Sequence, residues 1–283
     1  MRLRLRLIRG AVAALFVLLP TRRAEAQQAR SSHNVILATT TSLRDTGLLD
    51  SLLPFFERET GYHVRAVAVG SGQALKLAEL GDADVVLVHS PAAELDFMRA
   101  GYGVSRRVIA WNFFVLAGPL ADPARVREAP TAADALRRIA AAGAVFVSRG
   151  DSSGTHMREL ALWRQAGGRP RWRGYLETGQ GMGATLLVAD ERRGYTLTDG
   201  GTLAAFRGRV DLVPLRGQEA ALRNVYHVIE IEPRGRPRLN VAGGRAFADW
   251  ITSEHGQALI AAYHSRGPGA PYFVAAHGVE PSP

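Results

Sequence analysis

Two hydroxyl-rich segments of this chain have the chemistry to bind a small anion. Residues 39–42 (Thr-Thr-Thr-Ser) directly follow the apolar run 35–38, and residues 149–155 (Arg-Gly-Asp-Ser-Ser-Gly-Thr) follow the apolar run 145–147. Each segment leads into a helical pattern, so its hydroxyl and backbone N–H donors would gather beside the positive end of a helix dipole. Because the segments are far apart in sequence, we expect them to hold one anion from two sides.

Arg149 has the most specific chemistry of the candidates. Its guanidinium can give an oxyanion two parallel hydrogen bonds, which a lysine does less well. Arg149 stands at a predicted strand end, before Ser-Ser-Gly-Thr and a helix start, which favours a ligand-facing role over a surface ion pair. We interpret Asp151 as the acid that orients Arg149, or as a helix N-terminal acid, and not as a catalytic base.

Ser71 and His89 follow two other predicted strands. Ser71 lies in a Gly-Ser-Gly turn after residues 64–69, where it could be a simple turn residue or reach the same ligand as residues 39–42. His89 follows the buried-looking strand 84–88, which favours a core or cleft-wall position over ligand contact.

Other chemistries fit the sequence poorly. Residues 150–154 (Gly-Asp-Ser-Ser-Gly) resemble a serine-protease nucleophile loop, but that chemistry needs a His base and a second Asp on an all-β fold. The eight histidines show no metal-ligand spacing, and the glycines of residues 179–183 lack the spacing of a dinucleotide site. We interpret residues 179–183 as a helix start on a cleft wall, and we expect no enzyme activity, metal or cofactor.

Alternating strand and helix patterns surround these segments and predict an α/β protein with largely parallel sheets. Residues 46–59 place Leu48, Leu49, Leu52, Leu53 and Phe56 on one helical stripe, with Gly61 as a stop and Pro54 as a kink. The apolar run 108–118 and the region around 215–225 are the candidate crossings between two lobes.

The first residues predict export. Four arginines precede an apolar run at residues 11–19 that is too short to span a bilayer, and Ala24-Glu25-Ala26 offers a cleavage site. Removing residues 1–26, which carry six arginines and one glutamate, lowers the formal charge from +9 to +4. This modest surplus does not favour a nucleic-acid partner. The chain has no cysteine, so neither a disulfide nor a lipid-modified cysteine is expected, and we predict a periplasmic protein without a lipid anchor.

Five stretches of the chain resemble the substrate-binding receptors of bacterial tungstate importers of the ABC class. They are residues 38–64, 68–91, 146–160, 177–186 and 194–203. The combination of TTTS at residues 39–42 with SRGDSSGTH at residues 148–156 is specific, and the similarity covers nearly the whole predicted mature chain.

The resemblance implies a two-lobed periplasmic-binding-protein type II fold, with a mostly parallel sheet and flanking helices in each lobe. Lobe 1 would comprise residues 31–112 and 222–283, and lobe 2 residues 113–221. The ligand would be tungstate or molybdate, held in the interlobe cleft of a monomer and delivered to an ABC permease. The implied anion contacts are Thr40, Thr41, Ser42, Ser71, Arg149, Ser153 and Thr155.

Two positions depart from the pattern of these receptors. Phe113 stands where an acid is usual, and Gly200 where an arginine is usual, and neither lies in the proposed anion loops. The choice of anion rests on protonation: phosphate keeps a proton near neutral pH and benefits from a carboxylate acceptor, whereas tungstate, molybdate and sulfate need donors alone. Receptors for phosphate place a Ser-Asp pair after an earlier strand, where this chain has His89-Ser90. A phosphate or sulfate receptor, and an oxyanion sensor outside transport, remain the alternatives.

Overall fold

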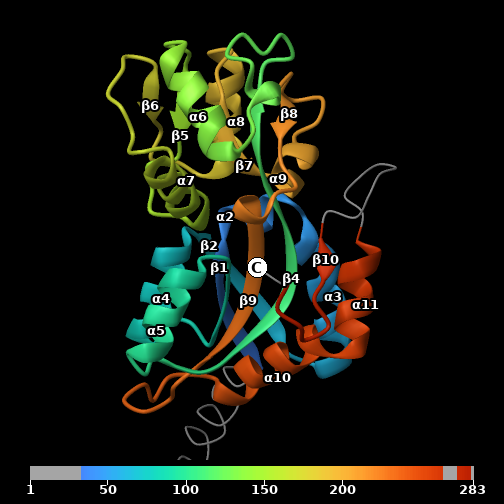
Figure 1. Ribbon diagram of the computed structural model, residues 1–283. Coiled ribbons are helices and arrows are strands. Elements are labelled where there is room, and N and C mark those ends of the chain that lie inside the picture. Colours follow the sequence, from blue (N-terminus) through green and yellow to red (C-terminus); the bar gives the residue numbers. More distant parts are fainter. Residues whose placement is uncertain (1–32, 264–272, 282–283) are drawn as a thin grey trace, which may run out of the picture.

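A computed structural model describes residues 33–263 and 273–281 as an α/β protein with an upper and a lower lobe (Figure 1). The predicted signal peptide, residues 1–26, lies outside the described residues. None of the described helices is both long enough and apolar enough to cross a membrane.

The lower lobe contains a sheet with strands in the order β2-β1-β3-β9-β4-β10. Its strands are β1 (Asn34–Thr40), β2 (His63–Val69), β3 (Val85–Val88), β4 (Gly103–Gly118), β9 (Arg223–Ile231) and β10 (Val274–Ala275). Its helices are α2 (Thr41–Asp45), α3 (Leu48–Thr60), α4 (Ser71–Leu80), α5 (Pro91–Arg99), α10 (Val241–Thr252) and α11 (Glu254–Ala262), with α2 nearest the upper lobe (Figure 1).

The upper lobe contains β5 (Phe146–Ser148), β6 (Tyr175–Glu177), β7 (Thr196–Asp199) and β8 (Val213–Arg216). Its helices are α6 (Ala132–Ala141), α7 (Gly154–Gln165), α8 (Met182–Glu191) and α9 (Gly200–Ala205), with short 3-10 turns η1 (Val126–Glu128) and η2 (Ala220–Leu222). Its core includes the fully buried rings of Phe146, Trp163 and Tyr195.

Strand β4 belongs to both lobes. It pairs with β9 and β10 in the lower lobe and with β7 and β8 in the upper lobe. Its 16 residues span about 50 Å when extended. β9 starts beside it, at the point where the chain returns to the lower lobe (Figure 1). The two candidate crossings therefore meet as a pair of neighbouring strands.

These crossing strands make the sheet mixed and not mostly parallel. The β1–β2 and β1–β3 pairings are parallel, as the helix–strand alternation predicts. The β3–β9 and β4–β9 pairings are antiparallel, because β9 runs back down beside β3 and β4.

Helix α3 shows how local sequence builds the lower core. The predicted stripe is confirmed, since Leu48, Leu49, Leu52 and Phe56 are buried. The helix begins at Leu48, two residues later than predicted, because Gly47 adopts the left-handed conformation with φ 79° and breaks the turn before it. Gly61 ends the helix in the same conformation, as predicted, with φ 74°.

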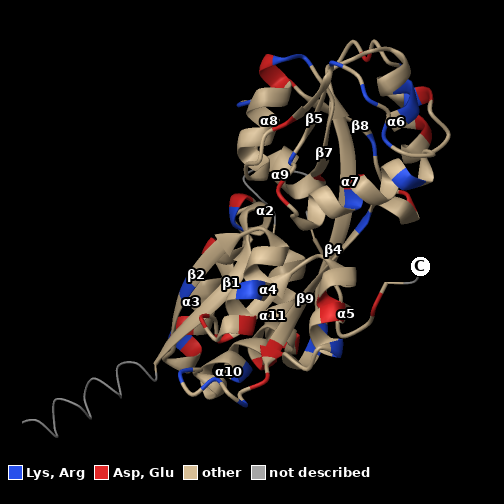
Figure 2. Cartoon of the chain, turned by 90° about the vertical axis from the view of Figure 1, so that its left-hand side faces the viewer, with Lys and Arg blue, Asp and Glu red and all other residues tan. Residues whose placement is uncertain are grey.

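Charges of both signs lie interspersed over the two lobes in the view of Figure 2. Ion pairs such as Lys76–Glu79 and Arg125–Glu128 join residues three positions apart. This distribution agrees with the small surplus of basic residues after residue 26.

Candidate oxyanion site between the lobes

The candidate residues lie at strand–helix junctions that face each other across the two lobes. In the lower lobe β1 runs into α2 and β2 into α4, and in the upper lobe β5 leads to α7 and β7 into α9 (Figure 1). Ligands of open α/β sheets bind at such junctions, outside the carboxyl ends of the strands. The topology thus brings together the segments around residues 40, 71 and 150.

The first loop presents three consecutive hydroxyls. Thr40 is the N-cap of α2, where its Oγ1 accepts from the backbone N–H of Leu43 at 3.3 Å. Thr40 Oγ1 and Ser42 Oγ are 3.2 Å apart, and Ser42 Oγ lies 3.0 Å from Nε2 of His89. Thr40 and Ser42 are buried and Thr41 is half-buried.

Arg149 reaches this loop from the opposite lobe. It is 2% exposed and donates through Nε to the carbonyl of Gln180 at 3.2 Å and through Nη2 to Thr41 Oγ1 at 3.4 Å. Nη2 also donates to the carboxylate of Asp151, which confirms the predicted orienting role of that acid. The glycine-dense stretch 179–183 forms the start of α8 at Gly181, next to Thr41, as predicted.

Ser71 and Thr155 carry buried hydroxyls without a protein partner. Ser71 is 0% and Thr155 is 1% exposed, and neither hydroxyl has a hydrogen bond within the described residues. Buried polar groups are nearly always satisfied, so two orphan donors in these loops fit a missing polar ligand. Ser153 is the N-cap of α7, and its hydroxyl oxygen accepts from the His156 N–H at 3.2 Å. His156 therefore lies in the first turn of α7.

The lobes touch around these residues. A Cβ on Gly154 would lie 2.6 Å from the carbonyl oxygen of His89, and one on Gly70 would lie 3.6 Å from the carbonyl oxygen of Asp151. The Thr202 hydroxyl oxygen lies 3.4 Å from the Ser42 carbonyl oxygen. The structure therefore has a closed interlobe site.

Two carboxylates that interact with Arg149, those of Asp151 and Asp199, already accept hydrogen bonds from the protein. Asp151 accepts from Arg149 and, at 3.1 Å, from Ser153 N–H. Asp199, the N-cap of α9, accepts from the Thr202 N–H at 2.8 Å and from its hydroxyl at 2.6 Å. Burial raises the pKa of Asp199, which its bonds to Thr202 partly offset. The arrangement offers donors to a ligand, and its carboxylates are engaged elsewhere.

Sequence reasoning missed the two buried asparagines behind this loop, Asn112 and Asn224. His89 Nδ1 lies 2.8 Å from Asn224 Oδ1, and Asn224 Nδ2 donates to Asn112 Oδ1 at 2.9 Å and Tyr226 Oη at 2.8 Å. His89 is 2% exposed and stacks on Tyr226, in the cleft-wall position that its strand end favoured. Desolvation by burial lowers its pKa to about 4. A signal existed: Asn112 interrupts an otherwise apolar crossing run.

The two departures from the receptor pattern are neighbours in the structure. A Cβ on Gly200 would lie 3.4 Å from the carbonyl oxygen of Phe113. Phe113 instead packs edge-on against Trp111, with ring centroids 5.5 Å apart. Because an acid and a base are replaced side by side, neither replacement leaves an unpaired charge in the cleft wall.

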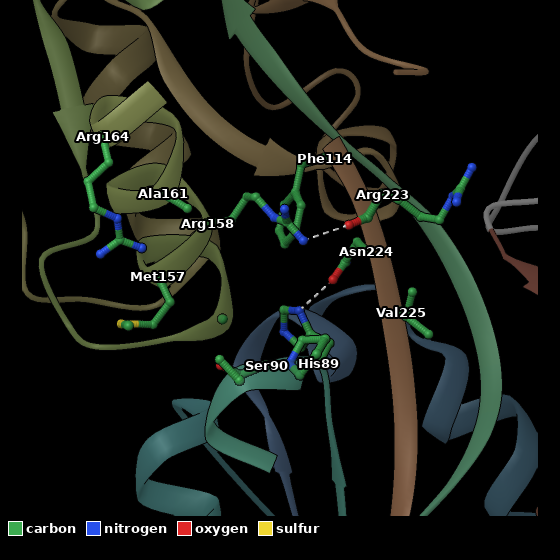
Figure 3. A pocket seen from close by; sticks show the side chains of 13 residues that line it. His89, Ser90, Phe114, Met157, Arg158, Ala161, Arg164, Arg223, Asn224 and Val225 are labelled. Atoms are coloured by element: carbon green, nitrogen blue, oxygen red, sulfur yellow. Dashed lines mark hydrogen bonds between the residues drawn. The ribbon is translucent and has the colours of Figure 1, made fainter. Parts of the chain in front are cut away.

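A second pocket, of about 280 Å³, opens next to the site (Figure 3). Its lining includes His89 and Gly154. It also includes Met157, Ala161 and Arg164 of helix α7. None of the seven predicted anion contacts lines it. Its polar groups include Arg158, which donates to the backbone carbonyl of Arg223 at 3.2 Å. Within the described residues, no group of three or more His, Cys, Asp or Glu side chains could hold a metal ion.

Comparisons with known proteins agree with this geometry. Residues 24–255 match the model of the PBP superfamily domain. The chain is 44% identical to the tungstate-binding protein TupA of Peptoclostridium acidaminophilum over 88% of either chain. Two solved structures are similar. The tungstate ABC transporter structure from Geobacter sulfurreducens is 46% identical, with a TM-score of 0.75, and the match covers 81% of this chain and 98% of that one. The tungstate-binding protein TupA of Desulfovibrio alaskensis G20 is 43% identical, with a TM-score of 0.71, and the match covers 86% of this chain and 98% of that one. The chain therefore belongs to the PBP superfamily and, within it, to the family of these tungstate-binding proteins.

Proposed function

We propose that this protein is the extracytoplasmic receptor of an ABC importer and captures tungstate, or the nearly isosteric molybdate, between its lobes. The contacts would be the hydroxyls of Thr40, Thr41 and Ser42, those of Ser71, Ser153 and Thr155, and the guanidinium of Arg149. Lobe 1 would comprise residues 31–112 and 222–283, and lobe 2 residues 113–221.

One observation carries the proposal: among the described residues the site holds two buried hydroxyls without partners, those of Ser71 and Thr155. The carboxylates of Asp151 and Asp199, in contrast, already accept from protein donors. A tetrahedral anion without protons needs only such donors, whereas hydrogen phosphate also needs an acceptor for its own proton. The names of the relatives support tungstate among the proton-free anions.

The family also supports a binding role without chemistry. We propose that the protein acts as a monomer, is exported through cleavage near residue 26, and releases its anion to a permease. No catalytic step is proposed, and incubation with generic ester substrates would reveal any hydrolase activity of the Ser152-Ser153 loop.

Titration calorimetry and thermal shift with tungstate, molybdate, sulfate, phosphate and vanadate test the proposal. Tungstate and molybdate should raise the melting temperature most, because ligand that binds only the folded state stabilises it by mass action. A larger shift with phosphate would favour a phosphate receptor. Absence of any shift with tungstate up to millimolar concentration would refute the proposed function.

A further inference from the structure

A chain of buried hydrogen bonds connects the crossing strands to the first anion loop. It runs from Asn112 on β4 through Asn224 on β9 to His89 at the end of β3, and on to Ser42 and Thr40. The four links measure 2.9, 2.8, 3.0 and 3.2 Å. Figure 3 shows the Asn224 amide pointing at the imidazole of His89. All five residues are at most 6% exposed.

In one donor–acceptor direction, this series of hydrogen bonds turns the Ser42 and Thr40 hydroxyl protons away from the ligand. If the Asn224 amide donates to Asn112, its oxygen accepts the Nδ1–H of His89, and Nε2 is then a lone pair. That lone pair takes the Ser42 hydroxyl proton, and the Ser42 oxygen in turn can accept the Thr40 hydroxyl proton. Ser42 and Thr40 would then present lone pairs to an anion, which is repulsive.

The opposite direction supplies donors. With both amides flipped, Asn112 donates to Asn224, Asn224 donates to Nδ1, and His89 Nε2–H donates to Ser42. The hydroxyl protons of Ser42 and Thr40 are then free for the ligand. This direction also uses the Nδ2 group of Asn112, which is buried without a partner in the first direction.

His89 is neutral at pH 7, so its tautomer and not its charge decides between the two directions. Burial lowers its pKa to about 4. Two charged groups act on it: Glu94 of α5, which raises the pKa, and Arg149 beyond β5, which lowers it. The aromatic neighbours are Tyr226 of β9, with ring centroids 4.8 Å apart, and Phe114 of β4, at 6.1 Å.

We infer that the anion-bound protein holds His89 as the Nε2–H tautomer, set by Asn224 and Asn112, so that Ser42 and Thr40 become donors to the ligand. His89 is thus a positioning residue that does not touch the anion. The inference rests on the proposed function, because only a proton-free anion requires donors from both hydroxyls.

Nitrogen-15 NMR of the protein labelled at histidine tests the inference directly. Chemical shifts and ring couplings distinguish a protonated from an unprotonated ring nitrogen, and a His89→Gln variant identifies the His89 signals among those of the eight histidines. With saturating tungstate we expect a protonated Nε2 and an unprotonated Nδ1. A bound form with protonated Nδ1, either as the other tautomer or as imidazolium, would overturn the inference.

Two variants give an independent test in calorimetry. His89→Gln keeps an N–H donor near the Nε2 position and should bind tungstate within a few-fold of the unchanged protein. His89→Leu keeps the bulk but leaves the buried Ser42 oxygen without its N–H partner and lets the hydroxyl turn away from the ligand, so it should bind tungstate about tenfold more weakly. Equal affinities of the two variants would overturn the inference, and thermal denaturation verifies that both fold.

The failure of the inference is distinct from failure of the proposed function. Tungstate binding by the unchanged protein is measured first, and its absence would refute the proposed function and the inference together. Binding with the wrong tautomer refutes only the role of His89.

Discussion

Removing the hydroxyl of Ser71 or Thr155 should weaken anion binding without weakening the fold. The perturbations are Ser71→Ala and Thr155→Val, which keep the size of each side chain nearly unchanged. Both hydroxyls are buried and without a partner in the described residues. They contribute no hydrogen bond to the ligand-free protein, so the substitution removes none from it.

The expected changes in affinity and stability follow from this difference between the ligand-bound and the ligand-free protein. A hydrogen bond to a charged ligand contributes about 1.5–3 kcal/mol, so each variant should bind tungstate about 10- to 150-fold more weakly. A buried hydroxyl without a partner costs about 1–3 kcal/mol, so the free energy of unfolding of the ligand-free variant should stay unchanged or increase. Opening of the lobes hydrates the hydroxyl and reduces that gain.

Calorimetry with tungstate and chemical denaturation without it measure the two effects. Thr39→Val is the matched control: the Thr39 hydroxyl is equally buried but donates to the Leu87 carbonyl at 2.9 Å. It should lose about 1 kcal/mol of stability and bind tungstate within a few-fold of the unchanged protein. The reasoning is refuted if Ser71→Ala and Thr155→Val bind normally, or if they lose stability as Thr39→Val does.

Three further predictions concern the charge, the closure and the pH response of the site. Arg149→Ala should lower tungstate affinity about 30- to 1,000-fold in calorimetry. The control is Arg158→Ala, an arginine of the neighbouring pocket, which should bind within a few-fold of the unchanged protein. If both variants bind within a few-fold of the unchanged protein, Arg149 lies outside the site. Gly154→Ala should lower affinity at least about tenfold and abolish ligand-induced compaction in X-ray scattering, because its Cβ would lie 2.6 Å from the His89 carbonyl oxygen and hold the lobes apart. Gly72→Ala, whose Cβ would lie 3.6 Å from the Ser152 carbonyl oxygen, should close normally, and closure of both variants would contradict the contact. Burial lowers the His89 pKa from 6.5 to about 4, so the unfolded state binds more protons and stability should fall as pH decreases between these values. Denaturation curves should show that the free energy of unfolding falls by about 3 kcal/mol over this pH range in the unchanged protein, and that His89→Gln lacks this loss. Parallel pH profiles of the two proteins would refute the prediction.

Local sequence predicted much of the scaffold. The α3 stripe, the glycine stop at residue 61 and the helix starts at Ser153 and Gly181 all appear in the structure. Each depends on residues within a few positions, through side-chain periodicity, a cap or a left-handed glycine. The pairing of Arg149 with Asp151 was predictable for the same reason, because two positions separate them.

The amino-acid sequence shows which segments carry hydrogen-bond donors, and the resemblance of those segments indicated a two-lobed receptor. Which of these donors meet depends on the tertiary structure. Arg149 reaches Thr41 across the cleft from 108 positions away, and His89 reaches Asn224 from 135 positions away. The antiparallel return of β9 beside β3 and β4 creates the second contact and makes the sheet mixed. Local patterns carry no information on such pairings. The pairings depend on how whole strands are ordered in space and on which buried groups then lack water.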